Sequence, residues 1–94
     1  MTINEFRATL SAAEPPAVPT LLHALWYDAR GDWDRAHSIA QEVDDVRGAW
    51  VHAYLHRKEG DLENAGYWYQ RAGRDVASDS LDAEWERIAA ALLP

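Results

Sequence analysis

Two glycine–aspartate pairs, Gly31-Asp32 and Gly60-Asp61, most constrain how this chain can fold. Glycine adopts the left-handed conformation that ends a helix without a Cβ clash. Aspartate is a good N-cap for the next helix, because its carboxylate accepts hydrogen bonds from free backbone N–H groups. Each pair therefore predicts a tight corner between two helices, and corners this short force those helices to run antiparallel.

The sequence around the second corner repeats the sequence around the first at an offset of 29 residues. The aligned pairs keep the residue size or chemistry: His23 with His52, Ala24 with Ala53, Ala36 with Ala65, Leu22 with Val51, Leu25 with Tyr54, Trp26 with Leu55 and Trp33 with Leu62. Periods of roughly 20–50 residues are typical of stacked helical repeats. We therefore expect two similar helical hairpins that pack against each other.

Composition narrows the class of protein. The chain has 94 residues, 48% of them hydrophobic and 27% charged, which fits one folded domain. A net charge of −7 argues against nucleic-acid and anionic-membrane partners, which need clustered Lys and Arg. There is no cysteine, no apolar run long enough for a membrane span and no basic, apolar signal-peptide start. We therefore expect a cytoplasmic protein.

Hydrophobic periodicity predicts an all-α fold of about six helices in a single domain, 1–94. The expected units are an N-terminal capping helix at 3–13, a first hairpin at 20–43, a second hairpin at 46–73 and a C-terminal capping helix at 80–93. The first helix of the second hairpin is apolar around most of its circumference, so we expect neighbours on several of its sides. In the last helix, Glu84 and Arg87 have the spacing of a surface ion pair.

The second repeat carries small residues, a corner and an aromatic residue at characteristic places: Ala53, Gly60-Asp61-Leu62, Ala65, Tyr69 and Ala72. In this it resembles the tetratricopeptide-repeat superfamily and its Sel1-like relatives, and it is similar to a small group of bacterial proteins built on this fold. The resemblance covers about 20–73. It implies a right-handed stack of antiparallel helical hairpins, and a non-enzymatic adaptor that binds a peptide or protein segment along a concave face.

The resemblance implies that this face is formed by the first helix of each repeat. Its residues here are Arg47, Trp50, Tyr54, Arg57 and Lys58 from the second repeat, with Leu21, Leu25 and Asp28 from the first. An aromatic platform edged by basic residues can hold an apolar side chain beside a carboxylate. Alternatively, Trp50 and Tyr54 pack against a terminal helix, and Asp28 is a surface ion-pairing residue.

Histidines give a second hypothesis, a metal- or small-molecule-binding protein. His52 and His56 are four residues apart, so one helix face can direct both toward a single metal ion. His23 occupies the equivalent place one repeat earlier, and His37 starts from the adjacent helix. Glu59 follows one turn after His56. Alternatively, His52 and Glu59 belong to a solvated polar stripe.

Catalytic motifs are absent from the sequence. There is no glycine-rich phosphate loop and no GxSxG stretch, and the carboxylates fit helix caps, first turns and solvated faces. We therefore expect no enzyme and no cofactor. Tyr67 lies off the predicted buried stripe with Arg71 and Arg74 nearby, which is consistent with a homodimer contact as well as with a lone exposed aromatic residue.

Overall fold

A computed structural model describes all 94 residues and contains six α-helices and no strand. The helices are α1 (Ile3–Ala8), α2 (Thr20–Ala29), α3 (Trp33–Gln41), α4 (Val46–Glu59), α5 (Leu62–Ala72) and α6 (Leu81–Leu92). The predicted all-α fold of six helices is confirmed. A 3₁₀ turn, Thr9–Ser11, follows α1 where a longer α-helix was expected. None of the helices has the length and apolar character needed to cross a membrane.

Both glycine–aspartate corners form as the sequence predicts. Gly31 and Gly60 have φ angles of 87° and 90°, in the left-handed region that favours glycine. The carboxylates of Asp32 and Asp61 each accept a hydrogen bond of 3.2 Å from a backbone N–H in the first turn of the next helix. The corners therefore join α2 to α3 and α4 to α5 as two hairpins.

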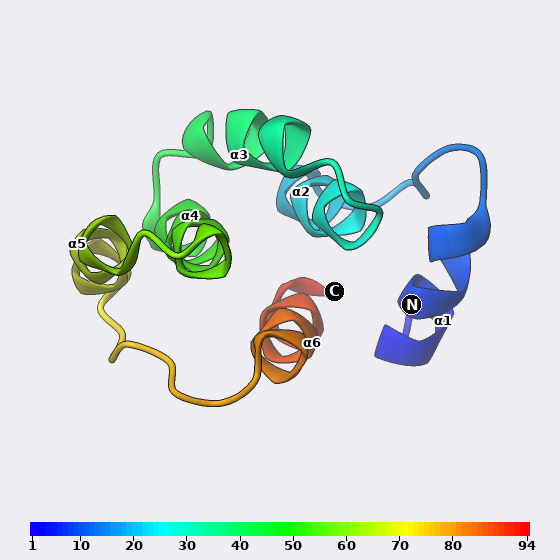
Figure 1. The fold of residues 1–94 in the computed structure, drawn as a ribbon. Helices are drawn as coiled ribbons and strands as arrows, with labels where there is room; N and C mark the ends of the chain where they lie inside the picture. Colours follow the sequence, from blue (N-terminus) through cyan, green and yellow to red (C-terminus); the bar gives the residue numbers. More distant parts are fainter.

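The two hairpins form a curved layer, and α6 lies inside the curve (Figure 1). Within the layer α3 contacts α4, whereas α6 packs against α4, α2 and α1. Every residue from Gly48 to His56 in α4 is buried, as expected for a helix that is apolar nearly all round. The centre of the molecule is therefore α4.

Tryptophan side chains form hydrogen bonds between helices through their indole N–H groups. Trp33 of α3 donates to the backbone oxygen of Leu55 in α4 at 2.8 Å, and Trp85 of α6 donates to that of Leu25 in α2 at 2.9 Å. Each bond satisfies the single donor of a large apolar side chain within the fold. The first bond also fixes the position of α3 over α4, on which the candidate site depends.

Candidate metal centre

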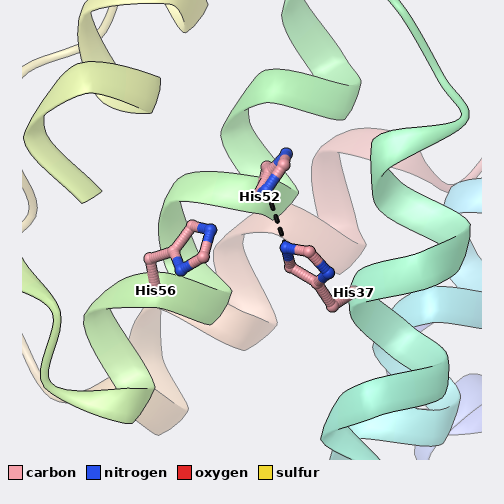
Figure 2. A group of neighbouring side chains, drawn as sticks. All are labelled: His37, His52 and His56. Carbon is pink, nitrogen blue, oxygen red and sulfur yellow. Dashed lines mark hydrogen bonds between the residues drawn. The ribbon is translucent and has the colours of Figure 1, made fainter. Parts of the chain in front are cut away.

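Three histidines from two different hairpins converge between α3 and α4. His37 comes from α3, whereas His52 and His56 come from α4 (Figure 2). One ring nitrogen from each of them lies within 4.8 Å of the other two. The Nε2 atoms of His37 and His52 are 2.9 Å apart and share a hydrogen bond.

Helix geometry explains how the sequence brings these rings together. His52 and His56 are one turn apart on α4, so their rings stack with centroids 4.8 Å apart. On α3, Trp33 and His37 have the same spacing and also stack, at 4.9 Å. Trp33 and His37 lie on the same face of α3, and the hydrogen bond from Trp33 holds that face against α4. His37 therefore faces the two histidines of α4.

Aromatic rings wall the cluster off from solvent. Trp68 of α5 stacks on His52 with centroids 3.9 Å apart, and Trp33 meets the ring of His56 edge-on. His52 and His56 are only 6% and 7% exposed, and His37 is half-buried. The predicted alternative of a solvated polar stripe is therefore wrong for His52.

This environment favours neutral imidazoles. Burial, together with the neighbouring His37 and His56, lowers the pKa of His52 to about 4. Burial and the neighbouring His56 also lower the pKa of His37, with Glu59 and Asp34 opposing the shift. A neutral imidazole has a nitrogen lone pair free for a metal ion, whereas a protonated one does not.

The carboxylate of Glu59 orients His56. It lies 2.6 Å from Nδ1 of His56, so the hydrogen-bond network assigns the ring proton to Nδ1. The lone pair is then on Nε2, which lies 3.3 Å from the side-chain amide nitrogen of Asn64. Metal-binding histidines commonly donate their other ring N–H to a carboxylate, which fixes the tautomer and the ring orientation.

The spacing of the three nitrogens suits a transition metal. Tetrahedral zinc, with Zn–N bonds of about 2.0 Å, holds its ligand nitrogens roughly 3.3 Å apart. The nitrogens here lie within 4.8 Å of one another, with one pair at 2.9 Å, so their separations span that spacing. His56, Glu59 and Asp61 also lie within 4.8 Å of one another, but both carboxylates are exposed and Asp61 is already the N-cap of α5.

The structure changes the set of histidines that the sequence proposed. His23, the repeat equivalent of His52, lies outside the cluster, and its Nε2 pairs with the backbone oxygen of Pro16 at 2.9 Å. His37 takes the third place, because it starts from the helix that packs on α4. Sequence reasoning missed the contacts of Trp33 and Asn64 with His56 and the stacking of Trp68 on His52, since residues in different helices meet only once the packing is known.

The face predicted to bind a peptide is covered by α6. Trp50 and Tyr54 are 4% and 2% exposed, and Leu25 and Asp28 of α2 are also buried. The alternative that Trp50 packs against a terminal helix is confirmed, because its indole nitrogen reaches Glu84 of α6. Asp28, Tyr54 and Lys58 line a hollow of about 310 Å³ that α6 also borders. Of the predicted peptide-binding residues, those that retain exposed side chains are Arg47 and, in part, Lys58.

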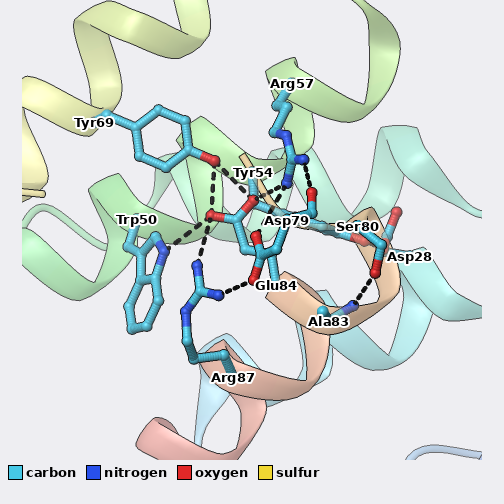
Figure 3. A network of polar contacts seen from close by, with 10 residues as sticks. All are labelled: Asp28, Trp50, Tyr54, Arg57, Tyr69, Asp79, Ser80, Ala83, Glu84 and Arg87. Atoms are coloured by element: carbon cyan, nitrogen blue, oxygen red, sulfur yellow. Dashed lines mark hydrogen bonds and ion pairs between the residues drawn. The ribbon is translucent and has the colours of Figure 1, made fainter. Parts of the chain in front are cut away.

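Glu84 of α6 is the hydrogen-bond acceptor for basic and aromatic residues of this face (Figure 3). Its carboxylate is fully buried, with Arg57 at 2.8 Å, the Tyr69 hydroxyl at 2.7 Å and the Trp50 indole nitrogen at 3.3 Å. The predicted partner Arg87 is 4.0 Å away. The prediction that Glu84 lies at the surface is wrong, because its buried carboxylate accepts hydrogen bonds from three side chains.

Asp28 is also an internal partner. Its carboxylate accepts a hydrogen bond from the Tyr54 hydroxyl at 3.1 Å and pairs with Lys58 at 2.9 Å. Burial and the adjacent Asp28 raise the pKa of Tyr54, so the hydroxyl remains a donor. Asp28, Tyr54 and Lys58 therefore link α2 to α4 within the fold.

Comparison with known proteins adds no family or function. No protein-family model matches the chain, and no curated protein or solved structure matches it either. The resemblance to tetratricopeptide repeats stays a prediction.

Proposed function

We propose that this protein binds a divalent transition-metal ion through the imidazoles of His37, His52 and His56. The observation that carries the proposal is the convergence of three largely enclosed imidazole nitrogens within 4.8 Å. The lowered pKa values of His37 and His52 support it, because those rings are uncharged at neutral pH. Glu59 supports it further by holding the His56 ring through its contact with Nδ1.

The donor set defines the class of metal. Imidazole suits zinc, copper, nickel and cobalt, whereas calcium and magnesium prefer oxygen ligands. The chain has no cysteine, so thiolate ligation is excluded. We expect zinc to be the usual ion, because three imidazoles match its common coordination.

Binding would connect the two hairpins. His37 belongs to the α2–α3 hairpin, whereas His52 and His56 belong to the α4–α5 hairpin. An ion held by all three would clip α3 to α4 and stabilise the folded state by mass action, by about 2.7 kcal/mol at a free-metal concentration 100 times the dissociation constant. Metal binding would therefore also increase the stability of the two packed hairpins.

The test is isothermal titration calorimetry with zinc on protein that carries no affinity tag, since a polyhistidine tag would itself bind the metal. We expect one ion per chain. The variant His52→Ala should lose more than the roughly 10–100-fold in affinity that removal of an outer partner costs, because it removes a direct ligand.

His23→Ala is the matched control, because His23 lies outside the cluster. It should bind zinc like the wild type. Equal loss in both variants, or absence of binding by the wild type, would refute the proposal. We prefer metal binding to a peptide-binding adaptor, because Trp50, Tyr54 and Arg57 are already engaged by other parts of the chain.

A further inference from the structure

Asn64 reaches the histidine cluster from a third helix, α5. Its amide nitrogen lies 3.3 Å from Nε2 of His56. One turn further along α5, Trp68 stacks on His52, which is one turn before His56 on α4. The antiparallel packing of α5 on α4 therefore sets both contacts, because the paired residues lie at matching distances from the corner that joins the two helices.

The contact of Asn64 is with the nitrogen of His56 that faces the other histidines. Nδ1 of His56 is held by Glu59 at 2.6 Å, whereas Nε2 lies on the side of the ring toward His52 (Figure 2). The amide N–H of Asn64 therefore points at the lone pair that a metal ion would use. A metal ion on Nε2 of His56 would have this amide as its neighbour.

The amide of Asn64 can itself act as a metal ligand. A half-turn of the amide group exchanges its oxygen and nitrogen atoms, so it brings Oδ1 close to the place that Nδ2 occupies. That place is 3.3 Å from Nε2 of His56, which matches the roughly 3.3 Å between two ligands of tetrahedral zinc. The half-turn breaks no other contact, because Asn64 forms no other side-chain hydrogen bond.

We infer that Asn64 binds the same metal ion through Oδ1, as the fourth ligand beside the three histidines. The inference rests on the proposed function, because three imidazoles leave one position of a four-coordinate ion unfilled. Four protein ligands make a closed site, which is typical of structural zinc, whereas a catalytic site keeps a position for water or substrate. The ion would then be held by three helices, α3, α4 and α5.

The test compares the cobalt(II) complexes of the tag-free wild type and Asn64→Ala, because the visible absorption of cobalt reports its ligands. Azide is titrated into each at constant pH and ionic strength. The closed wild-type site should give no azide-dependent change, whereas Asn64→Ala leaves one position open and should give a saturable change. Asn64→Ala should also weaken cobalt binding by at least roughly 10-fold, the lower end of the cost of removing an outer partner.

Gln70→Ala is the matched control, because Gln70 is an exposed amide residue of the same helix. It should behave like the wild type in both measurements. Asn64→Asp replaces the amide oxygen with a carboxylate oxygen, which is a common zinc ligand. This variant should bind cobalt at least as tightly as the wild type and should not respond to azide.

An azide response in the wild type would overturn the inference, because it would reveal an open coordination position. Unchanged cobalt affinity in Asn64→Ala, absence of an azide response in that variant, or the same response in Gln70→Ala would also overturn it. Each of these outcomes leaves metal binding by the histidines intact. Failure of the wild type to bind cobalt would instead refute the proposed function itself.

Discussion

The Nε2 atoms of His37 and His52 lie 2.9 Å apart although the two residues belong to different hairpins. At this separation one nitrogen donates a proton and the other accepts it, so both rings can be neutral but not both protonated. A metal ion that takes the place of this proton would keep both rings neutral. Protonation of the two rings, metal binding and the packing of α3 on α4 therefore all depend on this contact.

Acid should destabilise the metal-free protein through this contact. A histidine titrates near 6.5 when unfolded, whereas His52 titrates at about 4 in the folded chain. The unfolded state therefore binds more protons between these values, so stability is complete above about 6.5 and falls as the pH drops toward 4. We expect a loss on the order of 2 kcal/mol from His52, measured by urea unfolding in the presence of a chelator.

The variant His52→Gln isolates this effect from the titration of carboxylates. It removes the group with the lowered pKa, so its stability should change less between pH 7 and pH 4.5. His37 shifts in the same direction and leaves a residual slope. An unchanged pH dependence in His52→Gln would show that the cluster does not control acid stability.

Removing the buried carboxylate of Glu84 should loosen α6. The variant Glu84→Ala leaves Tyr69 and Trp50 without their acceptor and leaves Arg57 with Asp79 alone, and breaking a buried pair typically costs about 3–5 kcal/mol. Glu86→Ala is the control, because Glu86 is half exposed and pairs with Arg7 at 3.5 Å. It should cost less than about 1 kcal/mol. Equal urea midpoints for the two variants would contradict the description of Glu84 as an internal anchor.

Two helical glycines should respond to alanine in opposite ways. A Cβ at Gly48 would overlap the backbone oxygen of Val43, whereas a Cβ at Gly66 meets no atom within 4 Å. Gly48→Ala should therefore destabilise the protein by roughly 1–3 kcal/mol. Gly66→Ala should stabilise it by about 0.5–1 kcal/mol, because alanine is the better helix former. Thermal unfolding of both variants measures this, and a shift of the same sign in both would be inconsistent with the packing before α4.

The helical architecture was predictable from local signals. Two local features depend only on neighbouring residues, so they could be predicted from the sequence alone. They are the left-handed conformations of Gly31 and Gly60 and the helix caps formed by Asp32 and Asp61. The nearly all-round apolar character of α4 likewise indicated its central place. These features do not depend on which distant segment covers each face.

The use of the side chains was not predictable in the same way. The pattern of α4 shows that Trp50 and Tyr54 need a partner, but a terminal helix and a bound peptide satisfy that need equally well. The spacing of Glu84 and Arg87 is the same on an exposed and on a covered helix, so burial of Glu84 had no sequence signal. His37 joined the cluster because α3 packs on α4, whereas the repeat alignment favoured His23.

The most direct test of the metal centre is X-ray absorption spectroscopy at the zinc edge of tag-free protein loaded with one equivalent of zinc. A zinc ion held by His37, His52 and His56 should give a first shell at about 2.0 Å with the scattering signature of three imidazoles, falling to two in His37→Gln. A spectrum of His37→Gln that equals the wild-type spectrum, or a shell of oxygen ligands without an imidazole signature, would contradict a metal centre between α3 and α4.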